Sequence, residues 1–280
     1  MKNFFVILKG DFEAEVIIRL LKRNDQEFLV VEKEDWNRFD QLSDQVQNKI
    51  LNKIGNEYQI YFVKFSIEVS GELLKKVEII NSDGKYETTW EAEKNTALWR
   101  VAGIVGCGIT MFERLVIKNQ VGYVFHMDEF IELASLRGQC SERSLIAMRD
   151  NVLRGEQIAR GVTRRELGMA KEAVKNKKEY EGTRSRNLTV VSLPTDKNGP
   201  VMDLLFSEYG YDFDVLLIKM KNGQIIFSPH QELTEKIQKK VQELDKESWT
   251  TRKETSARDR IFIKNTEIDI ETIIRDYIVS

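Results

Sequence analysis

The sequence has few of the residues that build the commonest catalytic and metal sites. It contains two histidines, His126 and His230, so neither a histidine-rich metal centre nor a serine–histidine–aspartate triad is expected. Its two cysteines, Cys107 and Cys140, lack metal-ligand spacing and indicate reduced thiols in a cytoplasmic protein. No apolar run approaches the roughly 18 residues of a membrane helix, and no cleavage site follows the N-terminus. We therefore expect a cytoplasmic protein without a membrane segment.

An excess of charge of one sign is also missing. The 280 residues include 43 basic and 45 acidic side chains, a formal net charge of −2. Such a chain has no overall field that would attract nucleic acid or an anionic membrane, so any phosphate-binding surface must be local. Apolar residues make up 41% of the chain, which is enough to build a proper core.

The first 85 residues alternate between strand and helix patterns. Short apolar runs, typical of strands buried on both faces, alternate with stretches of helical period. The expected strands are 4–8, 27–31, 59–65 and 77–80, and the expected helices are 16–23 and 36–54. This alternation predicts a parallel sheet with helices on its faces.

Later segments change character twice. Helices are expected at 96–105, 110–119, 125–136, 141–155 and 163–178. Thr110 and Thr163 each precede a glutamate by three residues, the spacing of a capping box. The charged, turn-rich stretch from Glu179 to Asn187 predicts a boundary, and strand patterns return after it, with a hairpin about Lys221-Asn222-Gly223.

We therefore predict an α/β fold in two lobes. A parallel-sheet N-terminal domain spans 1–135, a helical connector and linker spans 136–186, and a smaller α/β C-terminal domain spans 187–280. In open α/β sheets the working groups lie where strand ends meet helix starts.

The segment after the first strand is the leading candidate for a site. Lys9, Asp11, Glu13 and Glu15 lie in what we expect to be a tight acidic connection, with the helix beginning at Val16. The three carboxylates suit either a residual one-metal site or a solvated acidic turn that complements the N-terminus of the helix.

Basic residues suggest two places for an anion. Lys9 and Lys64 either form a phosphate pocket at the end of the sheet, or Lys64 pairs with a carboxylate such as Asp11. Arg184 and Arg186 either contact phosphates or belong to a solvated linker.

Several stretches together resemble the DHH/DHHA1 phosphoesterase superfamily of RecJ and nanoRNase-like proteins. The segments 95–102 and 112–123 are similar to the helical stretch after the DHH motif, and 154–163 to the helix that connects the lobes. The segment 188–229 is similar to the start of the DHHA1 domain. The likeness spans nearly the whole chain.

The catalytic residues that the resemblance implies are largely absent. The family's first motif falls on Lys9, Asp11 and Glu13, and its second aspartate falls at or near Lys64. The DHH signature falls around 81–84, the last metal-binding aspartate at Gln120, and the glycine-rich histidine motif near 255–258, where there is no histidine. Of the implied ligands, Asp11, Glu13 and Asp83 are the ones able to bind a cation.

A lysine is a poor replacement for a metal ligand. Two-metal hydrolysis needs several carboxylates and imidazoles around two cations. Two unit positive charges about 4 Å apart repel each other by about 4 kcal/mol at an effective dielectric constant near 20, so an ammonium disfavours a cation beside it. We therefore expect no two-metal centre and no cofactor.

Two functions from different classes follow from the resemblance. The first is a catalytically degenerate protein that binds a nucleotide or single-stranded nucleic acid, or assembles with a protein partner or a second copy of itself. The second is a phosphodiesterase on short oligonucleotides or nucleotide second messengers, with Mn²⁺ or Mg²⁺ held by Asp11, Glu13 and Asp83. The third possibility is a two-domain α/β protein that is unrelated to this superfamily.

Overall fold

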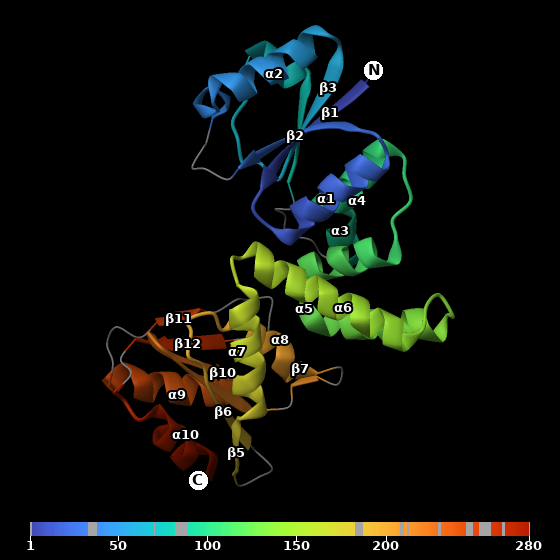
Figure 1. The fold of residues 1–280 in the computed structure, drawn as a ribbon. Coiled ribbons are helices and arrows are strands. Elements are labelled where there is room, and N and C mark those ends of the chain that lie inside the picture. Colours follow the sequence, from blue (N-terminus) through green and yellow to red (C-terminus); the bar gives the residue numbers. More distant parts are fainter. Residues whose placement is uncertain are drawn as a thin grey trace. The chain divides into compact units, whose positions relative to one another are not determined.

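The computed structural model describes most of the chain. The described residues are 2–32, 38–69, 71–81, 89–182, 187–207, 210–211, 213–228, 231–244, 249–251, 259–264 and 267–279. They form two compact units, Met1–Arg160 and Gly161–Ser280 (Figure 1). The two helices that lie within the predicted connector, α6 (Glu142–Ala159) and α7 (Arg164–Lys175), belong to the first and the second unit respectively. The three-part division at 135 and 186 stays a prediction.

A four-stranded parallel sheet forms the centre of the N-terminal unit. Its strands are ordered β2-β1-β3-β4, and every neighbouring pair is parallel. Their bounds are Lys2–Lys9 for β1, Glu27–Glu32 for β2, Tyr58–Val63 for β3 and Val77–Ile80 for β4. The predicted α/β class is confirmed.

Helices cover both faces of this sheet because β1 is apolar at every central position. Phe5 and Ile7 belong to one core with the apolar sides of α1, α4 and α5. Phe4 and Val6 point the other way, into a core with Ile50 of α2. The helices of this unit are α1 (Phe12–Arg23), α2 (Asp44–Gly55), α3 (Thr89–Lys94), α4 (Ala97–Val105), α5 (Met111–Leu136) and α6, with short 3-10 turns η1 (Phe39–Gln41) and η2 (Gly71–Lys75).

Several helical predictions for this unit are wrong in their boundaries. The helix predicted at 36–54 begins only at Asp44, after η1, and the helix predicted at 141–155 continues to Ala159. The predicted start at Val16 is four residues too late, because Asp11 caps α1 and the helix begins at Phe12. The predicted helices 110–119 and 125–136 are one helix, α5. The gap predicted between 119 and 125 contains Gly122, but an isolated glycine costs a helix only about 1 kcal/mol and does not end it. The capping boxes at Thr110 and Thr163 are confirmed.

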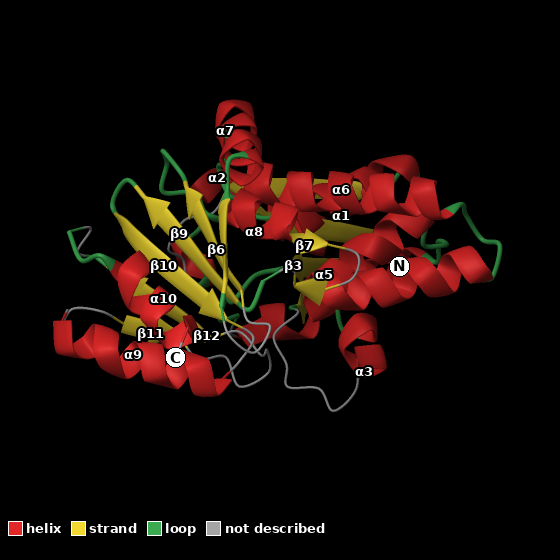
Figure 2. Ribbon diagram, turned by 90° about the horizontal axis from the view of Figure 1, so that it is seen from below, coloured by secondary structure: helices red, strands yellow, loops and turns green. Residues whose placement is uncertain are grey.

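A six-stranded mixed sheet forms the C-terminal unit. Its order is β11-β12-β10-β9-β6-β5, and β6 and β9 pair in parallel while the other neighbours are antiparallel. Helices α9 and α10 cover one face, and α7 and α8 lie on the other (Figure 2). The remaining bounds are β5 Lys178–Glu181, β6 Asn187–Ser192, α8 Gly199–Leu205, β7 Phe206–Ser207, β8 Gly210–Tyr211, β9 Val215–Met220, β10 Gly223–Ser228, α9 Gln231–Leu244, β11 Trp249–Thr251, β12 Asp259–Ile263 and α10 Ile270–Val279.

The charged stretch predicted as a domain boundary begins with a strand, β5. Lys178–Glu181 pairs antiparallel with β6 at the edge of the sheet. Edge strands tolerate alternating charge because they present one side to solvent, so the charge pattern did not distinguish a strand from a linker. The predicted hairpin between 214–219 and 224–227 is confirmed as β9 and β10.

Close packing of α1 on α6 gives a first testable prediction. A Cβ atom added at Gly155 would lie 2.3 Å from the Phe12 ring, whereas one added at Gly103 of α4 would meet nothing within 4 Å. Gly155→Ala should therefore destabilise the N-terminal unit by about 1–3 kcal/mol through overpacking. Gly103→Ala should leave its stability unchanged or raise it by up to about 1 kcal/mol. Urea unfolding of the two variants checks this, and equal stabilities would contradict it.

Candidate functional site

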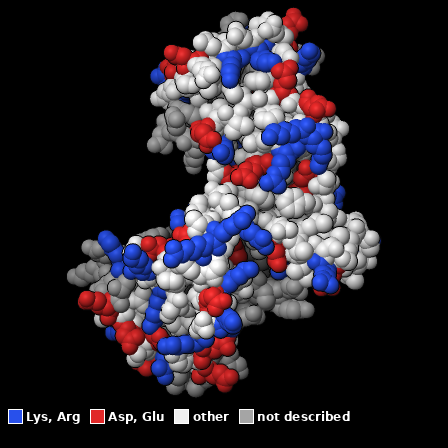
Figure 3. Space-filling model, viewed as in Figure 1, with Lys and Arg blue, Asp and Glu red and all other residues white. Residues whose placement is uncertain are grey.

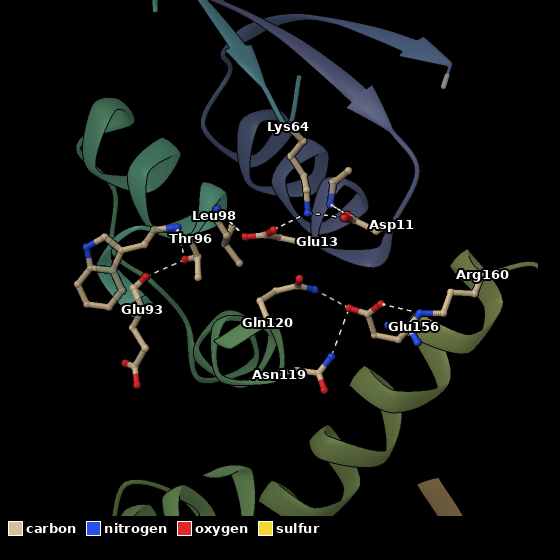
Figure 4. Close-up of polar contacts among 12 residues, drawn as sticks. Asp11, Glu13, Lys64, Glu93, Thr96, Leu98, Asn119, Gln120, Glu156 and Arg160 are labelled. Atoms are coloured by element: carbon tan, nitrogen blue, oxygen red, sulfur yellow. Dashed lines mark hydrogen bonds and ion pairs between the residues drawn. The ribbon is translucent and has the colours of Figure 1, made fainter. Parts of the chain in front are cut away.

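A cluster of charged and amide side chains lies where β1 and β3 end, all within the N-terminal unit (Figure 4). Asp11 begins the cluster as the N-cap of α1. Its Oδ1 accepts a hydrogen bond from the Ala14 amide at 2.9 Å. Its Oδ2 forms an ion pair with the Lys64 ammonium. The Asp11 carboxylate therefore caps the start of α1 and pairs with the lysine at the same time.

Glu13 is the most deeply buried acid of the cluster. Its side chain has 0% exposure and lies in the first turn of α1. Oε2 accepts from Lys64 Nζ at 2.6 Å, and Oε1 accepts from the Leu98 amide at 2.9 Å. Leu98 is in the first turn of α4, where backbone amides have no partner inside the helix. Both oxygens of Glu13 are therefore satisfied by the protein itself.

Lys64 joins the two acids from an unusual backbone conformation. It follows β3 directly and has φ of +66°, while its amide donates to the Ile80 carbonyl at 2.8 Å. A left-handed backbone costs a residue other than glycine about 1–2 kcal/mol. Such a conformation persists where the surrounding structure requires it. Here it accompanies an ammonium held against Asp11 and Glu13.

The lysine is charged despite its burial. Its side chain is 14% exposed, and burial alone would lower its pKa. The negative charges of Glu13 and Asp11, and their hydrogen bonds to the ammonium, outweigh this and raise the pKa above its ordinary value.

A third acid, Glu156 of α6, faces the same cluster with two amides beside it. Its Oε1 accepts from Gln120 Nε2 at 2.7 Å and from Asn119 Nδ2 at 3.3 Å. Arg160 Nε lies 3.9 Å from its Oε2. Burial raises the pKa of the Glu156 carboxyl and the charge of Asp11 raises it further, while Arg160, Lys64 and Asn119 act against the shift.

Sequence reasoning missed Glu156. The Glu156–Arg160 pair has the i, i+4 spacing of two neighbours on a helix face, but that spacing is common on exposed helices. Nothing in the local pattern marks the glutamate as buried, because its burial comes from contacts between α5 and α6.

Of the predicted site residues, the structure brings together Asp11, Glu13 and Lys64, with Gln120 in the same cluster. The reading in which Lys64 pairs with a carboxylate is confirmed. Lys9 lies instead at the surface, where its Nζ is 3.1 Å from Glu32 of the neighbouring strand. Asp83, Arg184 and Arg186 lie outside the described residues, as does the segment 255–258, so their roles stay predictions.

These residues do not fit a divalent cation. The ammonium of Lys64 lies against both carboxylates that a cation would need, and the other oxygens of these carboxylates accept backbone amides. Across the described ranges there is no group of three or more histidine, cysteine, aspartate or glutamate side chains placed to hold a metal ion. The arrangement stabilises a buried, paired charge and orients the ends of α1 and α4.

The chain was compared with known proteins. No family model and no curated protein matches it. Among solved structures, it is similar to the DHH domain of a member of a family of ribosomal proteins, with 11% identity and a TM-score of 0.40 over 100% of this chain and 87% of that one. It is also similar to the pGpG-specific phosphodiesterase PggH from Vibrio cholerae, with 12% identity and a TM-score of 0.42 over 99% of both chains.

A third similar structure is RecJ in complex with Mg²⁺ from Thermus thermophilus, with 11% identity, a TM-score of 0.35, and coverage of 99% of this chain and 49% of that one. At TM-scores this low, the similarity carries no argument about the chemistry of this chain. No helix within the described ranges has the length and apolar character to cross a membrane.

Removing the Lys64 ammonium gives a second prediction. Lys64→Met leaves Glu13 buried and charged without a partner, which should cost about 3–5 kcal/mol of unfolding free energy. The double variant Lys64→Met, Glu13→Gln should recover most of this loss. Lys9→Met is the matched control, because its exposed pair with Glu32 should contribute less than about 1 kcal/mol.

Chemical denaturation of these variants measures the difference. If Lys64→Met and Lys9→Met lose the same small amount of stability, the buried ion pair does not hold the site together.

The pH dependence of stability gives a third prediction. Because the folded-state pKa of Glu156 is raised, the folded protein binds this proton more tightly than the unfolded chain does. The stability due to this group is therefore full below the ordinary glutamate pKa and is lost as the pH rises through the raised value. Glu156→Gln should flatten the pH profile over that window, as followed by urea unfolding.

Glu132→Gln on α5 is the control for this profile, since Glu132 is exposed. A Glu156→Gln profile that superimposes on that of the parent protein would contradict the assignment.

Proposed function

We propose that this protein is a catalytically degenerate relative of the DHH phosphoesterases that acts by binding or assembly rather than by metal-dependent hydrolysis. One observation carries the proposal: the Lys64 ammonium pairs with both Asp11 and Glu13. A tethered cation at this position competes with any divalent ion for the same oxygens, because two positive charges this close repel each other.

The nature of the ligand follows from the sequence resemblance and not from the site geometry. Nucleotides and single-stranded nucleic acid are the proposed ligands, with Arg184 and Arg186 as the proposed phosphate contacts, because Lys64 is engaged by Asp11 and Glu13 and Lys9 by Glu32. Acidic and basic side chains are interspersed on the face drawn in Figure 3, so such binding would depend on a local group of arginines and lysines. A protein partner or a second copy is the proposed alternative occupant, and a cytoplasmic location is part of the proposal.

The competing proposal is a metal-dependent phosphodiesterase built on Asp11, Glu13 and Asp83. It requires Lys64 to leave both carboxylates when a cation arrives. The ion pairs of Lys64 argue against this proposal, and so does the fact that both carboxylate oxygens of Glu13 already accept hydrogen bonds.

Calorimetric titration of metal-stripped protein with Mn²⁺ tests the proposal. We expect no tight binding and no hydrolysis of a short labelled oligonucleotide, because the carboxylates are already neutralised. Lys64→Ala should increase the affinity for Mn²⁺, since it removes the competing charge; Lys9→Ala is the control and should not. Tight Mn²⁺ binding with turnover that is lost in Asp11→Ala would overturn the proposal.

A measurement of oligonucleotide binding accompanies this experiment. Fluorescence anisotropy of the labelled oligonucleotide in EDTA should show binding that weakens as salt is raised. The Arg184→Gln, Arg186→Gln double variant should weaken it further. Binding that appears only with a divalent cation would favour the phosphodiesterase.

A further inference from the structure

A groove of about 470 Å³ lies in the N-terminal unit, where α1, α5 and α6 meet. It is lined by side chains from all three helices and is distinct from the Lys64 cluster. Phe12 follows Asp11 on α1 and Gly155 precedes Glu156 on α6, so the groove and the cluster are neighbours along both helices. Its volume lies within the roughly 300–1,000 Å³ typical of small-molecule sites.

The floor of the groove is apolar and preformed. The rings of Phe12 and Phe112 meet edge to face, with centroids 6.3 Å apart and planes at 87°. Phe12 is 5% exposed and packs against α6 where Gly155 has no side chain. Ile158 adds an apolar wall that is 47% exposed, although a side chain of this kind is usually buried.

The rim of the groove carries an excess of positive charge. Arg19 and Arg154 are exposed there, against one carboxylate, Glu15. Glu15 lies 3.8 Å from Arg19, and both side chains are well exposed, so this pair is weak. Arg154 makes no ion pair or hydrogen bond with another described residue. A guanidinium binds phosphate, phosphonate and carboxylate groups through two parallel hydrogen bonds.

We propose that this groove binds a small organic anion that carries a flat apolar ring. The anionic group lies at Arg154 and Arg19, and the ring lies against Phe112 and Ile158. The excess positive charge at the rim favours an acid, and the aromatic floor favours a ring over a bare ion. This inference is independent of the proposed function, because it uses neither the Lys64 cluster nor any metal.

Isothermal calorimetry with three probes tests the proposal. Phenylphosphonate has both the ring and the anion, methylphosphonate keeps only the anion, and benzyl alcohol keeps only the ring. We expect phenylphosphonate to bind most tightly. Arg154→Gln should weaken its binding by about tenfold, because it removes a charge-assisted hydrogen bond.

Arg143→Gln is the matched control, because Arg143 is exposed on α6 but does not line the groove. It should leave the affinity for phenylphosphonate unchanged. Arg19→Gln is a second variant and should weaken binding as Arg154→Gln does. All three arginines are exposed, so the fold should be retained, and circular dichroism checks this.

Three outcomes would overturn the inference. The first is no measurable binding of phenylphosphonate. The second is methylphosphonate binding as tightly as phenylphosphonate, which would remove the role of the aromatic floor. The third is equal binding by Arg154→Gln and Arg143→Gln, which would place the anion elsewhere.

Discussion

The N-terminal unit depends on one buried ion pair, that of Lys64 with Glu13. Glu13 has no exposed surface, and a buried carboxylate without a partner would be strongly destabilising. Lys64 supplies the compensating charge from the end of β3, and it also binds Asp11 at the start of α1. The same glutamate accepts the Leu98 amide of α4. The Lys64 ammonium and the two carboxylates thus connect the N-termini of α1 and α4 to the end of β3.

This constraint accounts for the strained backbone at Lys64. A residue with φ of +66° would be less costly as glycine, but glycine has no ammonium. The electrostatic gain at Glu13 offsets the backbone cost. Glu156 extends the cluster towards α5 and α6, where Gln120 and Asn119 satisfy it with neutral donors. Neutral amides in place of further acids limit the accumulation of negative charge around a single lysine.

Much of the fold could be predicted from the sequence, because its strands are short and continuously apolar. The parallel sheet of the N-terminal unit and the capping boxes at Thr110 and Thr163 follow from local pattern. The start of α1 did not, since the acids after β1 suit a solvated turn as well as the first turn of a helix. The strand β5 was missed because charged edge strands resemble linkers.

The site could be predicted in part. Asp11, Glu13 and Lys64 were identifiable because parallel strands place their carboxyl ends at one edge of the sheet. That Glu13 is fully buried, and that Glu156 joins the cluster, depends on packing between different helices, which no local pattern contains. The ion-pairing reading of Lys64 and the anion-pocket reading use the same residues, so the geometry was needed to distinguish them.

The most direct measurement is NMR of the Lys64 side-chain ammonium in protein with labelled lysines, with Lys64→Arg used to assign the signal. The account predicts that Lys64 stays protonated to a pH above that of ordinary lysines and that its signal is not broadened by added Mn²⁺. A Lys64 that deprotonates earlier than exposed lysines, or a signal that Mn²⁺ broadens selectively, would show that the carboxylates are open to a metal and would contradict the account.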